Sequence, residues 1–262
     1  SARSVKHRYL WVFKPLTHLS DEKKQPAHYL VVPAGGTGLV LRGLRKEPAA
    51  IGKWHLGWDL TYKEGKAKTV DNIDFTKRVA NGPTDRGFDY FYGLTSPSGP
   101  PHLYMVNDMA EKQPNTRFEE SGGGLYKIKG GIGHSDWSAD GMQPHLADKM
   151  LEYLDENKDS DKPFFLYMAL TAPHIPLFPS KEFKGKSKIG DYGDLVMMID
   201  DIVGRVNRKL KEIGKYDNTI VMFAADNGCA GYINMDRINR KGHYPSYIYP
   251  VSYTHLTLPT LN

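Results

Sequence analysis

The sequence predicts an α/β protein with a mostly parallel central sheet flanked by helices. Apolar runs at 163–170 and 219–225 have the length and composition of strands buried on both faces. Between them, 190–213 repeats apolar residues at three- and four-residue steps, as one face of a long helix does. A strand, a helix and a strand in this order form a βαβ unit, whose two strands run parallel in one sheet.

The other elements follow the same reasoning. Residues 49–52 form a short apolar stretch that ends at a glycine, which predicts a buried strand. Residues 59–143 are rich in Gly, Pro, Asn and Asp, so we expect mostly loop with short elements. A helix is predicted to start near Pro144, and Gly214 closes the long helix. The apolar face of the first helix consists of Leu146, Met150, Leu151 and Leu154.

Composition limits the function classes. The 262 residues are 40% hydrophobic and 25% charged, so the chain can bury a core. No run approaches the roughly 20 apolar residues of a membrane helix, which predicts no membrane span. The single cysteine, Cys229, excludes an internal disulfide framework. Residues 1–48 hold nine basic and three acidic residues, so the net charge of +5 is confined to one end and predicts no nucleic-acid partner.

Three polar clusters follow predicted strands. They are Lys53 with His55, then His174 between two prolines, then Asp226 with Asn227. Ligands of parallel sheets bind beyond the carboxyl ends of the strands, so we expect the clusters to converge on one pocket. Taken singly, each has a structural reading as well, such as an Asn-Gly turn or a capped loop histidine.

The residue types suit anion chemistry. A lysine and an imidazole two positions apart point the same way in extended backbone, and suit a small tetrahedral oxyanion with proton transfer beside it. His174 projects from a loop stiffened by proline, which suits a general acid or an anion contact. Asp226 and Asn227 offer hard oxygen ligands for Ca²⁺ or Mg²⁺.

Four strings of residues carry a family resemblance. They are GKWHLG at 52–57, TDRGFDYFYG at 84–93, APHIP at 172–176 and ADNG at 225–228. In this order they resemble the sulfatase family of the alkaline-phosphatase superfamily, over about residues 49–249. The likeness is greatest to the arylsulfatase group that includes N-acetylgalactosamine sulfatases, and it implies an alkaline-phosphatase-like α/β fold.

The resemblance implies hydrolysis of a sulfate ester. In the family, a divalent cation, usually Ca²⁺, assists a formylglycine made from the first residue of a Cys/Ser-x-Pro-x-Arg motif. Carried over, Asp226 and Asn227 are metal ligands and Lys53 holds the sulfate. His55 takes a proton from the formylglycine hydrate, and His174 binds sulfate and protonates the leaving oxygen.

The sequence also departs from the family pattern. The formylglycine motif is absent, no Asp-Asp pair precedes Ile51, and Lys241 lies too early to replace the family's later lysine. We therefore expect a truncated fold, incomplete at both ends, that lacks an early strand and leaves exposed sheet edges. We also expect weak Ca²⁺ binding, and little or no sulfatase activity from the chain as written.

These departures suggest a fragmentary or frame-shifted reading. We expect a poorly patterned segment at 1–48, possibly out of frame, and a partial sulfatase catalytic domain at 49–250. The tail at 251–262 resembles translated sequencing-adapter DNA. By analogy with the family, the protein is expected to be secreted, periplasmic or lysosomal.

The substrate class stays open between a small-molecule and a glycan sulfate ester, and so does the oligomeric state. Residues 72–126 are expected to line the pocket mouth, with Ser96, Ser98 and His102 as substrate contacts. Two alternatives remain. One is an inactive fragment or pseudo-enzyme that binds sulfated glycans. The other is a related phosphatase or phosphodiesterase, against which the GKWHLG string argues.

Overall fold

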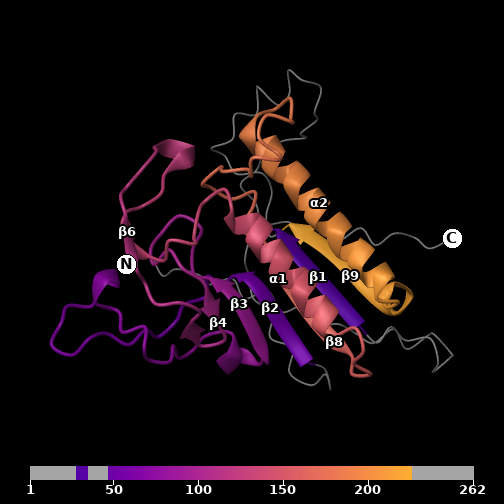
Figure 1. Cartoon of the computed structure of the whole chain (residues 1–262), viewed down its shortest axis with the longest axis horizontal. Helices are drawn as coiled ribbons and strands as arrows, with labels where there is room; N and C mark the ends of the chain where they lie inside the picture. The colour runs from indigo at the N-terminus through magenta and orange to yellow at the C-terminus, as the bar shows by residue number, and fades with distance from the viewer. Residues whose placement is uncertain (1–27, 35–46, 226–262) are drawn as a thin grey trace, which may run out of the picture.

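The computed structural model describes residues 28–34 and 47–225, and one seven-stranded sheet organises them (Figure 1). The strand order is β5-β4-β3-β2-β8-β1-β9. The strands are β1 (His28–Ala34), β2 (Glu47–Lys53), β3 (Tyr90–Leu94), β4 (Met105–Val106), β5 (Met109–Ala110), β8 (Phe164–Ala169) and β9 (Thr219–Ala225). A separate two-stranded sheet pairs β6 (Thr116–Phe118) with β7 (Gly131–Gly133).

The sheet confirms the predicted fold class. β3, β2, β8, β1 and β9 are parallel to one another, and β4 and β5 add an antiparallel edge next to β3. β9 has the predicted bounds, and β8 is one residue shorter at each end than the apolar run. The predicted βαβ unit is present as β8-α2-β9, but its strands are not neighbours, because β1 lies between them.

The expectation of a missing early strand is wrong for this sheet. β1 lies within the segment in which the sequence shows no sustained period, and it pairs in parallel with β8 on one side and β9 on the other. Its pairing with β9 runs in unbroken register from His28 opposite Thr219 to Ala34 opposite Ala225. The apolar run at 29–32 favours a strand, but its place in the sheet is set by pairing with segments far along the chain.

Two helices cover one face of the sheet (Figure 1). α1 (Met142–Glu156) starts two residues before the predicted Pro144, and α2 (Asp191–Glu212) matches the predicted helix to within one residue at each end. Two aspartates lie in the first turn of α2 and two lysines in its last turn, an arrangement that the helix dipole stabilises. Among the described residues, no helix is long and apolar enough to cross a membrane.

β8 is buried on both faces, as its continuous apolar run predicts. The same prediction is wrong for β9, which lies last in the strand order and leaves Ile220 37% and Phe223 53% exposed. In β8, Phe164, Leu166 and Met168 pack with the two helices, whereas Phe165 and Tyr167 pack on the opposite side. The opposite layer comes from the loop-rich region 54–110, which contributes buried aromatic and aliphatic side chains. Short 3₁₀ helices punctuate the loops, at Val70–Asn72, Thr84–Arg86, Gly124–Tyr126 and Tyr216–Asn218.

Candidate active site

The parallel strands end at one edge of the sheet, here called the carboxyl edge. Lys53, the last residue of β2, pairs with Leu94 at the end of β3, and Gly52 pairs with Ala169 at the end of β8. The segments that carry His55 and His174 therefore leave the sheet side by side. β9 reaches this edge at Ala225, but Asp226 and Asn227, which follow it, lie outside the described residues.

A glycine is required where β2 reaches this edge. Gly52 has φ +131°, a conformation that L side chains rarely adopt. A Cβ at this position would lie 2.0 Å from the carbonyl oxygen of Ala169, and one at Gly93 would lie 1.8 Å from the carbonyl oxygen of Gly52. The three strands thus approach closely beside Lys53, which accounts for the first residue of the GKWHLG string.

Lys53 and Trp54, at the end of β2, lie in different surroundings. Lys53 is only 7% exposed, an unusual degree of burial for a lysine, and its ammonium group is a source of positive charge inside the edge. Trp54 is buried in the layer opposite the helices, where its ring contacts Phe88 edge-on. Its backbone N–H donates to the carbonyl of Leu94 at 2.8 Å, and its indole N–H donates to the carbonyl of Gly57 at 3.3 Å. The tryptophan anchors the turn after β2, as the alternation of side chains predicts.

Three of the predicted site residues interact electrostatically. The pKa of His55 lies below its ordinary value because part of the ring is buried, and then because Lys53 and His174 both place positive charge near it. His55 is otherwise exposed at the surface. A neutral imidazole beside a buried ammonium can accept a proton while the lysine attracts an anion.

The loop that carries His174 is a tight turn. The backbone N–H of His174 donates to the carbonyl of Thr171 at 3.1 Å, and the Nδ1–H of its ring donates to the carbonyl of Ile175 at 2.6 Å. This second bond leaves Nε2 as the nitrogen that can exchange a proton with a ligand. The side chain is exposed, so a ligand can reach it.

Gln143 in α1 binds the start of this loop, a role that sequence reasoning did not predict. The residue is 2% exposed, and its amide oxygen accepts the N–H of Thr171 at 3.0 Å. The same oxygen contacts the N–H of Ala172 and the hydroxyl of Thr171. A sequence signal existed, because Gln143 lies three and seven positions before Leu146 and Met150, on the apolar stripe of α1.

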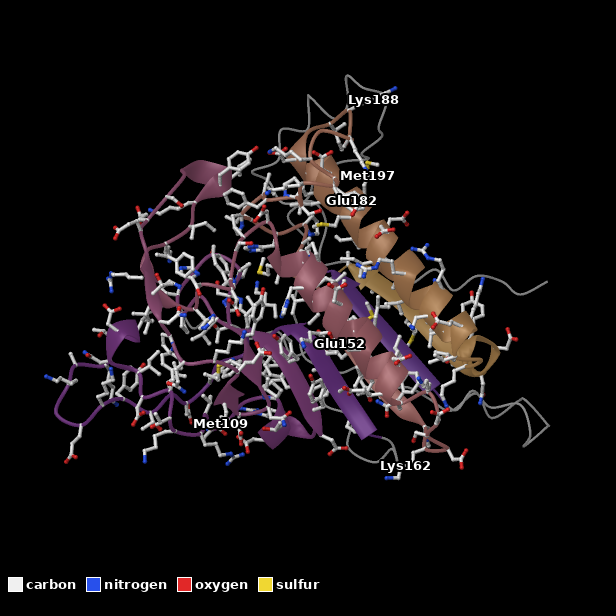
Figure 2. All side chains as sticks on the ribbon, in the orientation of Figure 1. Met109, Glu152, Lys162, Glu182, Lys188 and Met197 are labelled. Carbon is white, nitrogen blue, oxygen red and sulfur yellow. The ribbon has the colours of Figure 1, made fainter. Side chains whose placement is uncertain are left out.

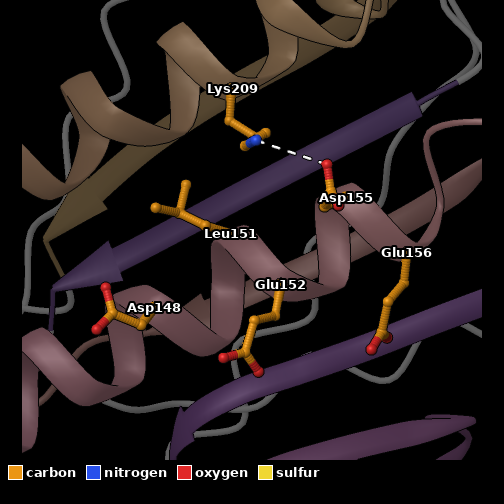
Figure 3. A pocket seen from close by; sticks show the side chains of 6 residues that line it. All are labelled: Asp148, Leu151, Glu152, Asp155, Glu156 and Lys209. Carbon is orange, nitrogen blue, oxygen red and sulfur yellow. Dashed lines mark ion pairs between the residues drawn. The ribbon is translucent and has the colours of Figure 1, made fainter.

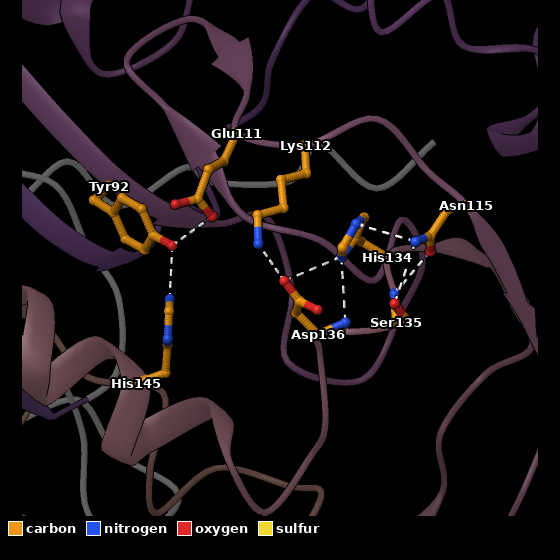
Figure 4. Close-up of polar contacts among 8 residues, drawn as sticks. All are labelled: Tyr92, Glu111, Lys112, Asn115, His134, Ser135, Asp136 and His145. Atoms are coloured by element: carbon orange, nitrogen blue, oxygen red, sulfur yellow. Dashed lines mark hydrogen bonds and ion pairs between the residues drawn. The ribbon is translucent and has the colours of Figure 1, made fainter.

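A polar network holds the first turn of α1 near Gln143 (Figure 4). The hydroxyl of Tyr92 donates to Glu111 at 2.7 Å and lies 2.6 Å from Nε2 of His145, which is therefore the donor of that bond. Burial raises the pKa of Tyr92 well above its usual range and lowers the pKa of His145. The network joins β3 to α1 and thereby supports the residues that hold the His174 loop.

The three expected substrate contacts are placed differently from one another. Ser96 and Ser98 are half-buried just beyond the end of β3, and the Ser98 N–H faces the Ser96 hydroxyl at 3.5 Å. His102 is 1% exposed and lies against Trp137, with its Nε2 bonded to the carbonyl of Lys129 at 2.7 Å. Its expected role is corrected here, because a ring enclosed in the core cannot contact a substrate.

An open groove elsewhere on the molecule has the wrong charge for an anion. It occupies about 460 Å³ between α1 and α2, and Figure 3 shows the six side chains that line it. Four of these are carboxylates, and Lys209 lies 3.6 Å from Asp155. This acidic lining would repel a sulfate group, so the carboxyl edge remains the candidate site.

The predicted metal ligands are not among the described residues. Within 28–34 and 47–225, no group of three or more His, Cys, Asp or Glu side chains could hold a metal ion. The donor types of Asp226 and Asn227 fit a hard cation, and the sequence places them directly after the strand that ends beside β1.

Comparison with known proteins decides the family. The sulfatase family model matches residues 40–249, most of the chain and all four motif strings. The chain belongs to the sulfatase family. It is 31% identical to the pig (Sus scrofa) N-acetylgalactosamine-6-sulfatase over 195 residues, which cover 73% of this chain and 32% of the pig protein.

Two further matches agree. An N-acetylgalactosamine-6-O-sulfatase of Bacteroides thetaiotaomicron is 27% identical over 234 residues, 76% of this sulfatase-family chain and 44% of that protein. A solved structure from work on glycosaminoglycan metabolism by the same bacterium superposes with a TM-score of 0.58 at 24% identity, over 76% of this chain and 47% of that one. The chain thus spans about a third to a half of these relatives.

Proposed function

We propose that the protein to which this chain belongs hydrolyses sulfate esters, and that the carboxyl edge described here binds the sulfate group. The observation that carries the proposal is the electrostatic coupling of His55 to Lys53 and His174 at that edge. Lys53 and His174 can stabilise the negative charge of a sulfate ester, and a histidine can donate the proton that the leaving alcohol oxygen needs.

Lys53 supplies the main attraction. Lys53 is 7% exposed, and the field of an ammonium group on an anion is stronger in such a region of low dielectric than at the surface. Its neighbours in β2 and β3 are held by the close approach at Gly52, so the ammonium is positioned before a ligand arrives. Pre-organised charge of this kind stabilises an anion without reorganisation.

The two histidines have different proton roles. His55 has a lowered pKa, so it is neutral at neutral pH and can take a proton from an attacking hydroxyl group. His174 has Nδ1 committed to Ile175, so its Nε2 binds a sulfate oxygen or passes a proton to the departing alcohol oxygen. The bond that breaks in hydrolysis joins sulfur to that oxygen, and the alcohol leaves with the proton.

A bound divalent cation would supply positive charge that stabilises the sulfate oxygens, and Asp226 and Asn227 are the residues of this chain that would hold it. The formylglycine does not fit the sequence, because no Cys/Ser-x-Pro-x-Arg motif is present among the 262 residues. The chain therefore offers the sulfate and proton-transfer groups, and we expect no turnover by the chain alone.

The substrate class we propose is a sulfated glycan. Its support is the likeness to proteins named N-acetylgalactosamine-6-sulfatase, which cover 69–76% of this chain. Ser96 and Ser98, half-buried beyond the end of β3, are the hydroxyls placed to meet a sugar next to the sulfate.

Sulfate binding by the purified 262-residue chain tests the proposal. Sulfate is titrated against the chain at constant ionic strength while NMR follows the ring protons of His55 and His174. We expect the ring resonances of both histidines to shift on binding. Lys53→Met should weaken sulfate binding at least about tenfold, because a charged contact is lost. Lys63→Met, which removes an exposed lysine that is not among the charges acting on His55, is the matched control.

Three results would contradict the proposal. The first is the absence of any shift at both histidines, and the second is an equal loss of affinity in the two lysine variants. The third is hydrolysis of an aryl phosphate, and not of an aryl sulfate, by the chain. Hydrolysis of an aryl sulfate by residues 1–262 would instead contradict the expectation that this chain lacks a nucleophile.

A further inference from the structure

A positively charged loop lies next to the candidate site. We name residues 181–190 the lysine loop, since they carry four lysines and one glutamate. All four lysines are exposed. Figure 2 shows Lys188 and Glu182 at the end of the molecule where α2 begins. The four are Lys181, Lys184, Lys186 and Lys188.

The lysine loop is held in shape from inside. Asp194 in the first turn of α2 is fully buried, and its carboxylate accepts the N–H groups of Gly185 at 2.7 Å and of Ser187. Gly193 leaves no room for a side chain, because a Cβ there would lie 2.0 Å from the Ser187 hydroxyl. The N–H of Lys184 donates to Ser180 at 2.9 Å. The charges are thus presented on an ordered surface.

Tyr126 connects this loop to the His174 loop. The hydroxyl of Tyr126 donates to Asp191 at 2.8 Å. The centres of the Tyr126 and Phe178 rings are 5.9 Å apart, and the ammonium group of Lys184 lies over the Tyr126 ring. The N–H of Leu177 also donates to the carbonyl of Leu125 at 2.8 Å. The lysine loop, the segment with Tyr126 and the loop with His174 therefore form one continuous rim.

Positive side chains outnumber negative ones on the lysine loop, and part of their charge is paired with Asp191. Lys184 pairs with Asp191 at 2.6 Å, and Lys186 lies 4.9 Å from the centre of the Phe183 ring. Residues 181–194 carry four lysines against Glu182, Asp191 and Asp194, a formal charge of +1. The groove between α1 and α2 is acidic by contrast, so the positive surface is local to the rim.

We propose that the lysine loop binds a second anionic group of a polymeric substrate, a sulfate or carboxylate on a sugar beyond the one whose sulfate occupies the carboxyl edge. This inference rests on the proposed function, and it favours a sulfated polysaccharide over a small aryl sulfate. A lone sulfate ester reaches one site only, whereas a polymer with repeated charges satisfies both at once.

Binding of chondroitin sulfate to the purified chain tests the inference at low ionic strength. The variant is Lys181→Gln/Lys186→Gln/Lys188→Gln, and the control is Lys63→Gln/Lys66→Gln/Lys68→Gln, which removes three exposed lysines from another loop. We expect about tenfold weaker polymer binding in the variant and less than about twofold in the control, with screening by salt. Binding of inorganic sulfate at His55 and His174 should be unchanged in both.

The outcomes separate this inference from the proposed function. Loss of polymer binding with retained sulfate binding supports the lysine loop. Equal losses in the two triple variants, or none, overturn it even where sulfate still binds. Equal affinity for single-stranded DNA with the same lysine dependence also overturns it, because the surface would then be a general polyanion site.

Discussion

The amide oxygen of Gln143 accepts the backbone N–H of Thr171 at 3.0 Å, directly after β8 ends. Thr171 in turn accepts the N–H of His174, so one buried side chain in α1 sets the start of the loop that carries a predicted catalytic histidine. The first turn of α1 thereby determines the geometry of a loop nearly thirty residues later in the chain.

Replacing this glutamine should loosen the His174 loop. Gln143→Leu leaves two buried N–H groups without an acceptor, which should lower the free energy of unfolding by about 1–3 kcal/mol. Amide hydrogen exchange at Thr171 and Ala172 should become faster. The matched control is Gln113→Leu, an exposed residue that bonds to the Phe75 carbonyl, with a cost below about 1 kcal/mol. Equal exchange rates in wild type and Gln143→Leu would contradict the anchoring role.

The strand end at Gly52 should not tolerate a side chain. Gly52→Ala combines an unfavourable φ with a contact to the Ala169 backbone, and should cost about 2–4 kcal/mol of unfolding free energy. Gly57→Ala is the control, because Gly57 has φ +93° but nothing within 4 Å of its Cβ position, so strain alone should cost about 1 kcal/mol. Urea denaturation measures both, and similar losses would contradict the close approach.

The pKa of His55 should report its two cationic neighbours. Lys53→Met removes a positive charge and should raise the pKa of His55, and His174→Gln should raise it by less. The part caused by burial should remain in both variants. NMR titration of the His55 ring measures the change, with Lys63→Met as a control that leaves it unaltered. An unchanged His55 pKa in Lys53→Met would show that Lys53 and His55 are not close together.

His102 should make the fold sensitive to acid. Burial lowers its pKa below the ordinary 6.5, partly offset by the bond to the Lys129 carbonyl, so the unfolded chain binds the proton more readily. Its stabilising contribution is present above pH 6.5 and is lost as the pH falls from there toward the lowered pKa of the folded state.

Urea denaturation over a range of pH values tests this. His102→Gln should cost about 1 kcal/mol at neutral pH, and its unfolding free energy should fall less steeply on acidification than that of the wild type. His134→Gln controls for the loss of any one histidine. If the unfolding free energy of His102→Gln fell with pH as steeply as that of the wild type, another group would cause the acid sensitivity.

The sequence by itself determined the elements whose pattern is local. The bounds of β9 and the burial of β8 follow from continuous apolar runs, and the extent of α2 follows from its helical period. The GKWHLG and APHIP strings predict where polar groups leave the sheet. The electrostatic coupling of His55 to Lys53 and His174 supports that convergence, while their catalytic roles stay predictions.

Only the tertiary structure decided what depends on distant partners. β1 takes its place between β8 and β9 through backbone pairing, and the residues of one strand do not indicate this order. His102 is polar yet enclosed by aromatic rings, and Gln143 serves a loop far along the chain. The physical reason is common to all three, because burial and hydrogen bonding to remote segments are set when the layers pack together, and local periodicity does not encode them.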